Sequence, residues 1–133
     1  MKLTSKSEYA LLALVYLARQ ADQGVIPVHA IATAQHIPEK FLEQILLALK
    51  RARFLRSVKG KGGGFQLARE PASISLAEVI RLFDGALAPT ESVSRYFYES
   101  TPIEKEKRLL AVFRKIRDLV AEHMEKTTLA DVV

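Results

Sequence analysis

A cluster of basic residues near the middle of the chain has the chemistry to bind a polyanion such as nucleic acid. No acidic residue interrupts the twelve positions that run from 50 to 61 and that hold Lys50, Arg51, Arg53, Arg56, Lys59 and Lys61. Ammonium and guanidinium groups gathered in this way produce a positive field that attracts phosphates. A solvated basic surface that binds nothing accounts for the charge equally well, so the cluster must be weighed with the residues around it.

The residues before this cluster carry side chains that can recognise the edges of bases. In a major groove Gln44 can bond adenine at two points, and Glu43 can accept from the amino group of cytosine. Lys40 can donate to guanine or to a phosphate. We interpret Arg51 as a phosphate contact rather than as a base contact. Glu43 has an alternative role as a solvated charge or as the ion-pair partner of a nearby lysine.

The apolar pattern places these side chains on the third helix of a helix-turn-helix. A first helix is predicted from Ser5 to about residue 20, with Ser5 and Glu8 as a capping box, and a second over residues 28–35. Pro38 then begins a third helix that extends to about residue 52. Its apolar residues recur at steps of one, three and four: Phe41, Leu42, Ile45, Leu46 and Leu49. Helix, short helix, tight turn and helix is the order typical of a helix-turn-helix.

A glycine-rich stretch behind the third helix predicts a wing. Residues 54–58 and 65–68 are short strand candidates on either side of a loop of lysines and glycines, which is typical of a β-hairpin. Glycines such as Gly62 let the backbone approach a sugar–phosphate wall closely, while Lys59 and Lys61 supply positive charge.

A closing helix completes the first predicted domain. Ser75 and Glu78 form a capping box for a helix that ends near Phe83, with Gly85 as its C-terminal cap. We therefore predict a winged helix-turn-helix DNA-binding domain over residues 1–85. These residues contain 12 Lys and Arg against 7 Asp and Glu, which accounts for the whole net charge of +5.

The rest of the chain is predicted to be a loop and a long helix. Residues 86–103 have two prolines and no clear period, and residues 104–133 form a helix and tail. In the helix Leu109, Phe113, Ile116 and Val120 alternate steps of four and three, which favours pairing with a second copy. Packing of this helix on its own domain is the alternative. The predicted fold is mainly α with a small β-hairpin: a winged helix-turn-helix domain plus a long C-terminal dimerisation helix.

Several chemistries are excluded by what the sequence lacks. Without cysteine there is no disulfide, no thiol nucleophile and no cysteine-ligated zinc or iron–sulfur cluster. Lys61 is followed by glycine rather than by Ser or Thr, so the loop is not a nucleotide-binding P-loop. The three histidines are far apart and form no metal motif. We expect no cofactor, no metal, no catalytic residue, no membrane partner and a cytoplasmic location.

The chain resembles a known bacterial family in five segments: Met1–Lys6, Tyr9–Ala10, Phe41–Ile45, Ser57–Phe65 and Thr128–Val133. These five segments, in this order along the chain, are similar to those of the bacterial winged-helix regulators typified by IscR, NsrR and CymR. The resemblance implies a homodimeric transcription factor that binds palindromic promoter DNA, and we predict that it is a repressor. It implies that the C-terminal helix crosses to the first helix of the partner subunit. Carried over from the family, the DNA contacts are Pro38, Lys40, Phe41, Glu43, Gln44, Lys59, Lys61 and Gly62.

The clearest departure from the family is in its sensor loop. Cluster-binding members carry three cysteines in the stretch that corresponds to residues 90–108. This chain has no cysteine there, and its hydroxyl-bearing residues in that stretch include Ser92, Ser94, Tyr96, Tyr98, Ser100 and Thr101. Hydroxyl groups do not replace thiolates in iron–sulfur clusters, so we predict a cluster-free member. The alternative function is a regulator that acts through a metabolic enzyme partner or a small ligand near the loop. Tyr96, Phe97 and Tyr98 are the candidate anchor for such a partner, unless they simply pack the loop on the helix.

Overall fold

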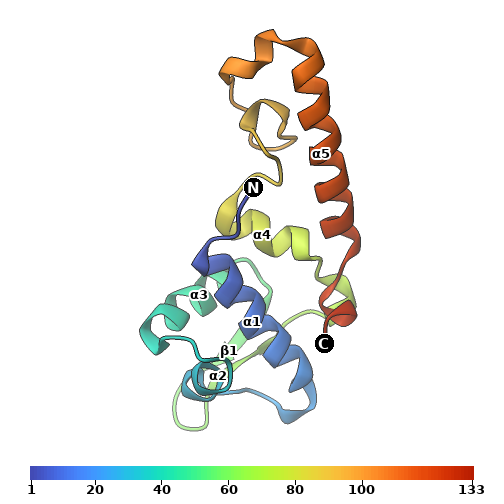
Figure 1. Ribbon diagram of the computed structural model, residues 1–133. Coiled ribbons are helices and arrows are strands. Elements are labelled where there is room, and N and C mark those ends of the chain that lie inside the picture. Colours follow the sequence, from blue (N-terminus) through green and yellow to red (C-terminus); the bar gives the residue numbers. More distant parts are fainter.

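Five helices and one β-hairpin make up the chain, and a computed structural model describes all of its residues, 1–133 (Figure 1). The elements follow in the order α1 (Ser5–Arg19), α2 (Val28–Gln35), α3 (Glu39–Arg51), β1 (Leu55–Val58), β2 (Gly64–Leu67), α4 (Leu76–Asp84) and α5 (Lys107–Lys126). The mainly helical fold with a small hairpin is confirmed. Helices α1 to α4 and the hairpin form the body, and the upper part of α5 projects from it beside residues 86–106. We call these residues and α5 the arm.

The core of the body lies between α1 and α3. Leu14 on α1 and Leu42, Leu46 and Leu49 on α3 are completely buried, together with Ile31 on α2. Removing each of these side chains from water contributes about 1.5–3 kcal/mol. The predicted period of the third helix is confirmed, since four of its five apolar residues form the buried stripe and its bounds agree to within one residue. Pro38 lies one position earlier than predicted, at the N-cap.

Thr4, and not Ser5, is the N-cap of the first helix, so the predicted capping box at Ser5 and Glu8 is wrong. Thr4 has an extended backbone, and its hydroxyl accepts from the backbone N–H of Ser7 at 3.3 Å. Its own N–H donates to the Asp84 carboxylate at the end of α4, at 3.2 Å. This contact fixes Thr4 outside the helix, and no local pattern indicates it.

The predicted capping box of α4 is confirmed. The N–H of Glu78 donates to the Ser75 hydroxyl at 3.2 Å, and the N–H of Ser75 donates to the Glu78 carboxylate at 2.9 Å. Gly85 caps the other end of this helix with a φ of 80°, as expected for a glycine at that position.

Arg53 turns the chain from α3 into β1. Its φ of 69° lies in the left-handed region, which glycine usually occupies. The N–H of Phe54 donates to the Leu49 carbonyl at 3.0 Å and the N–H of Arg53 to the Lys50 carbonyl at 2.9 Å, which is the Schellman pattern. The turn sets the direction in which the hairpin leaves α3.

The hairpin is antiparallel, with Leu55 opposite Leu67 and Val58 opposite Gly64. A third segment, which the sequence analysis does not predict, holds its base: Ile26 and Phe65 exchange two backbone hydrogen bonds of 2.8 Å. Gly64 is required at this point, because a Cβ there would lie 2.2 Å from the Ile26 carbonyl oxygen. The wing is thus attached to the body through the segment before α2.

The tail after α5 returns to the body. The N–H of Leu76 donates to the Thr127 carbonyl at 2.9 Å, and the N–H of Leu129 donates to the Ile74 carbonyl at 3.0 Å. Leu129 is fully buried in the core that α1 and α3 form. The division into residues 1–85, 86–103 and 104–133 remains a prediction, but the tail itself packs into the first of these parts.

The predicted loop over residues 86–103 is partly ordered against α5. It contains a short 3-10 turn, Glu91–Val93, and Val93 packs with Ala88 and with Leu110 of α5. The Arg117 guanidinium donates to the Val93 carbonyl at 2.8 Å. Loop and helix therefore form one packed unit in the arm.

Candidate nucleic-acid interface

The outward face of α3 carries three of the predicted base-contacting residues. Because 3.6 residues complete a turn, the face opposite the buried leucines displays Lys40, Glu43, Gln44, Leu47 and Arg51. All five side chains are exposed. None of the cations among them forms an ion pair with an acidic residue of the chain. Their charges are therefore available to a ligand.

Leu47 is a candidate that the sequence analysis missed. It lies at the centre of this face, seven residues after Lys40 and four before Arg51, and its side chain is 44% exposed. The other three leucines of α3 are buried. The signal was present in the spacing, since Leu47 does not fall on the stripe of Leu42, Ile45, Leu46 and Leu49.

Pro38 and Phe41 lie at the start of α3 in different environments. Pro38 is exposed at the N-cap, where its missing N–H costs no hydrogen bond. Phe41 is half-buried, and its ring meets the ring of Tyr9 edge-on with the centroids 5.6 Å apart. It packs α3 against α1, and its predicted contact with DNA stays a prediction.

The tip of the wing exposes Lys59, Lys61 and Gly62. Gly62 has a φ of 77°, and a Cβ placed on it would meet no atom within 4 Å, so its open surroundings leave the backbone accessible. Neither lysine has an ion-pair partner in the chain. The wing tip therefore presents two lysines without ion-pair partners beside an accessible backbone, and both features suit contacts with phosphates.

An open groove of about 330 Å³ separates α3 from the wing. Leu47 and Lys50 of α3 line one side, and Val58 and Lys59 of the hairpin line the other. Lysines thus border a partly apolar floor. The groove thus runs between the helix that carries the predicted base contacts and the wing that carries the predicted phosphate contacts, and Lys59 is the one of these contacts that lines it.

The loop of the arm holds hydroxyl groups that bond to one another. The Thr101 hydroxyl donates to Ser92 at 2.7 Å, and the Thr90 hydroxyl donates to Thr101 at 3.2 Å. The Tyr98 hydroxyl bonds to the Glu104 carboxylate, and this hydrogen bond raises the pKa of Tyr98. No group of three or more His, Cys, Asp or Glu side chains lies close enough to hold a metal ion. The donors present do not fit an iron–sulfur cluster, which requires thiolates.

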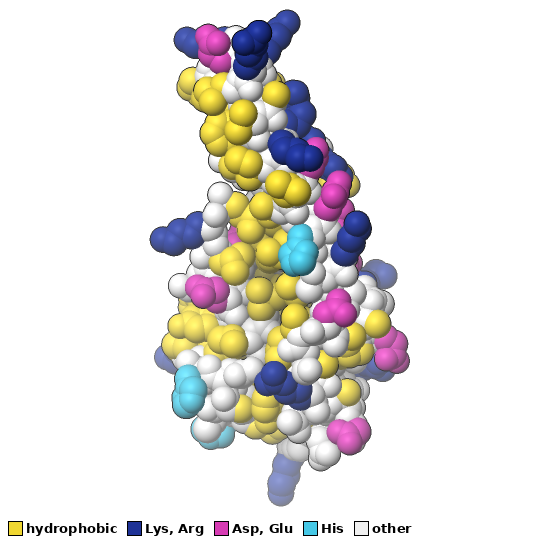
Figure 2. Space-filling view, turned by 45° about the vertical axis from the view of Figure 1, so that its right-hand side comes forward, with side chains coloured by type: hydrophobic (Ala, Val, Ile, Leu, Met, Phe, Trp, Pro, Cys, Tyr) yellow, Lys and Arg dark blue, Asp and Glu magenta, His cyan; other side chains and the backbone are white.

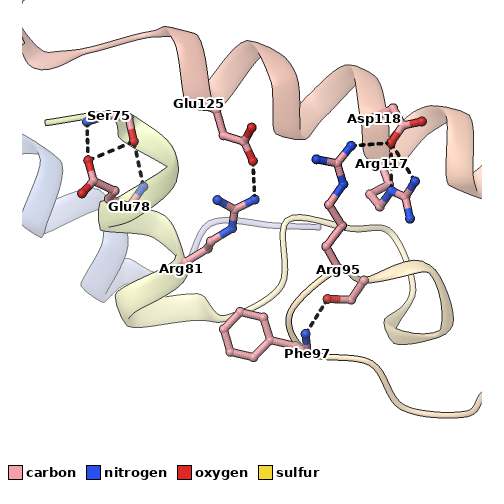
Figure 3. Close-up of polar contacts among 9 residues, drawn as sticks. Ser75, Glu78, Arg81, Arg95, Phe97, Arg117, Asp118 and Glu125 are labelled. Carbon is pink, nitrogen blue, oxygen red and sulfur yellow. Dashed lines mark hydrogen bonds and ion pairs between the residues drawn. The ribbon is translucent and has the colours of Figure 1, made fainter. Parts of the chain in front are cut away.

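The three aromatic residues of the loop are exposed, but they have contacts within the chain. The Arg81 guanidinium lies over the Tyr96 ring, 4.9 Å from its centroid. The N–H of Phe97 donates to the Ser94 hydroxyl at 2.9 Å (Figure 3). Their role toward a partner remains a prediction.

The exposed apolar stripe of α5 differs in part from the predicted dimerisation residues. Leu109 and Ile116 lie on it, and they alternate with Val112 and Leu119, which the prediction did not include. Phe113 instead packs against the cluster around Val93 within the same chain, and Val120 is half-buried. Figure 2 shows hydrophobic side chains gathered along the arm and continuing onto the body.

A helix-turn-helix, a β-wing behind it and uncompensated cations on both define a winged-helix DNA-binding regulator. The chain belongs to the Rrf2 family, whose model, described as an iron-dependent transcriptional regulator, matches residues 3–133. A provisionally named HTH-type transcriptional regulator of Mycobacterium tuberculosis is 38% identical over 136 residues, which cover 99% of this chain and 81% of that protein.

Two solved structures share the fold over nearly the whole chain. CymR of Bacillus subtilis, described as its global cysteine regulator, has a TM-score of 0.85 at 29% identity and covers 99% of this chain and 95% of its own. IscR of T. potens has a TM-score of 0.77 at 28% identity, with 99% and 85% covered. The chain is thus similar to transcriptional regulators rather than to enzymes, and the predicted resemblance is confirmed. None of its helices is both long and apolar enough to cross a membrane.

Proposed function

We propose that the chain is a homodimeric repressor that binds palindromic promoter DNA in the cytoplasm without an iron–sulfur cluster. The observation that carries the proposal is the common exposure of α3 and the wing tip. Lys40 and Arg51 on the helix and Lys59 and Lys61 on the wing all lack an acidic partner. Phosphates provide the charge that these cations do not find within the chain.

In this proposal α3 enters the major groove with its N-terminal turn leading. Lys40, Glu43 and Gln44 then face base edges. Lys40 can donate to guanine, Glu43 can accept from the amino group of cytosine, and Gln44 can bond adenine. Lys59 and Lys61 follow the neighbouring backbone into the minor groove. Their role is to position the protein, because phosphate contacts carry no sequence information.

The exposed stripe of α5 supports the dimer. Leu109, Val112, Ile116 and Leu119 follow one another at steps of three and four, which is the repeat of a coiled-coil seam. Leu119 is 60% exposed, and a contiguous apolar strip of this kind is typical of an interface between chains. A symmetric dimer binds two half-sites related by the same symmetry, which explains a palindromic site. An enzyme partner or a small ligand at residues 86–103 remains a hypothesis that no contact favours.

Selection of bound fragments from the genome of the source organism tests the proposal. We expect recovery of an inverted repeat, and anisotropy titrations of that repeat should give a Kd that rises by about a thousandfold from about 50 to about 200 mM salt. Lys59→Ala should lower the slope of log K against log salt by about one. Failure to enrich any fragment, together with a flat salt response, would overturn the proposal.

A further inference from the structure

Leu47 places a partly exposed apolar side chain on the outward face of α3. Its exposed neighbours on the face are Lys40, Glu43, Gln44 and Arg51, all of them polar or charged. Exposed leucines are common on protein surfaces and need no explanation when they stand alone. Leu47 does not stand alone: Val58 of β1, 53% exposed, lines the same groove. The two side chains make an apolar floor between the recognition helix and the wing.

The charges at the rim of this groove indicate what covers the floor. Lys50 lies on the α3 side and Lys59 on the wing side, and neither has an acidic partner in the chain. An apolar floor between two ammonium groups suits a ligand that is anionic at its edges and apolar between them. With α3 in one groove of DNA and the wing in the next, the strand that separates the two grooves must pass here.

Thymine supplies the apolar group. Its C5 methyl is the one hydrocarbon group that a base presents in the major groove, where adenine, guanine and cytosine present donors and acceptors. Leu47 lies between Glu43 and Lys50 on the side of α3 that faces the wing. We propose that Leu47 is a specificity-determining residue that contacts the methyl group of a thymine in each half-site, with Lys50 and Lys59 on the flanking phosphates. This inference rests on the proposed DNA-binding function.

Replacing single thymines by deoxyuridine tests the contact, because this substitution removes only the methyl group and keeps the base pair. In the selected operator, one thymine per half-site should be sensitive. Its replacement should weaken binding by the wild-type protein about fourfold, which corresponds to about 0.8 kcal/mol for one buried methyl or methylene group. Leu47→Ala should bind the thymine and deoxyuridine operators equally well. Leu47→Met, which keeps an apolar side chain, should retain the difference.

Lys61→Ala is the matched control. It should weaken binding to both operators by the same factor and leave the fourfold ratio unchanged, because the wing tip lies away from the methyl group. A ratio of one at every thymine with the wild-type protein would overturn the inference, as would a fourfold ratio that survives in Leu47→Ala. Either result leaves the DNA-binding function intact. If no operator is bound at all, both the inference and the proposed function fail.

Discussion

The Arg81 guanidinium of α4 contacts the Glu125 carboxylate of α5 at 2.7 Å (Figure 3). The same guanidinium lies over the ring of Tyr96 in the loop of the arm. One side chain thus joins the last helix of the DNA-binding part to both segments of the arm. Ala121 on α5 packs beside this contact against Ala77 and Ile80 of α4. Any movement of the arm relative to the body has to break or rearrange this contact.

The strength of this ion pair can be measured by a double-mutant cycle. Arg81 and Glu125 keep only 21% and 35% of their side chains exposed, so solvent screens them less than a surface pair. We expect a coupling energy of about 1 kcal/mol from urea unfolding of Arg81→Ala, Glu125→Ala and the double variant. The pair of His29 and Glu39, whose side chains are 79% and 48% exposed, is the control. Its coupling energy should be no more than about a few tenths of a kcal/mol. Equal coupling in the two pairs would contradict the prediction.

Gln44→Ala and Lys61→Ala should have different effects on DNA binding. Loss of the Gln44 side chain should reduce the free energy of binding to the preferred operator by about 1–3 kcal/mol. It should have little effect on binding to an operator that is changed at the contacted base. Loss of Lys61 should weaken all sequences alike. Anisotropy titrations against the operator and a set of single-base variants separate the two outcomes. The assignment of base and phosphate contacts is wrong if both substitutions give the same profile.

Leu119→Glu should convert the proposed dimer into a monomer. The carboxylate would be placed on the exposed stripe of α5, where pairing with a second copy would bury it at a high cost. Arg114→Glu is the matched control, because Arg114 is exposed on the opposite side of the same helix. Sedimentation equilibrium gives the mass of each variant. A Leu119→Glu protein that keeps the mass of the wild type would exclude this stripe as the interface.

Gly64→Ala should destabilise the fold more than Gly60→Ala. The new Cβ at position 64 would lie 2.2 Å from the Ile26 carbonyl oxygen, whereas at position 60 it would meet no atom within 4 Å. The strained φ of 90° at Gly60 costs about 1–2 kcal/mol by itself. At position 64 the backbone collision should add about 2 kcal/mol or more, since the wing must separate from Ile26. Urea unfolding of both variants measures the difference.

Acid should remove a stabilising contribution of Glu78. Burial raises the pKa of this carboxyl, but hydrogen bonds from Arg69 and Ser75 outweigh burial and leave the pKa below its ordinary value. The unfolded chain therefore binds the proton more readily, and the contribution is complete above the ordinary pKa and lost as the pH falls through the lower folded value. Glu78→Gln should be less stable than the wild type near neutral pH, with the difference shrinking toward pH 3. Arg69→Met removes the larger of the hydrogen bonds that lower the pKa of Glu78 but leaves those of Ser75, so it should weaken the acid dependence of the stability without abolishing it.

Local patterns predicted the elements well and the long-range contacts poorly. The stripe of α3, the capping box of Ser75 and the glycine-rich hairpin all depend on residues within a few positions of one another, so their spacing is visible in the sequence. The pairing of Ile26 with Phe65 and the hydrogen bond of Thr4 to Asp84, 80 positions away, leave no such trace.

The candidate interface shows the same division. Lys40, Glu43 and Gln44 could be assigned because polar residues on an amphipathic helix must face outward. Leu47 lies off the buried stripe and could have been assigned by its spacing, but a leucine in a leucine-rich helix is normally taken for part of the core. On α5, Phe113 has the period of a seam residue, yet the loop it packs against is distant in the sequence. Only the folded chain distinguishes an apolar residue that is covered from one that is not.

The burial of Leu129 sets an order of events during synthesis. The core between α1 and α3 includes this leucine, and the Ile74–Leu76 segment forms backbone hydrogen bonds with Thr127 and with Leu129 itself. While the ribosome still holds residue 129, the helix-turn-helix and the wing are already translated but their core is incomplete. The nascent chain therefore cannot acquire its full stability until that residue has emerged from the exit tunnel. The core of the DNA-binding part is therefore completed only after translation of the arm.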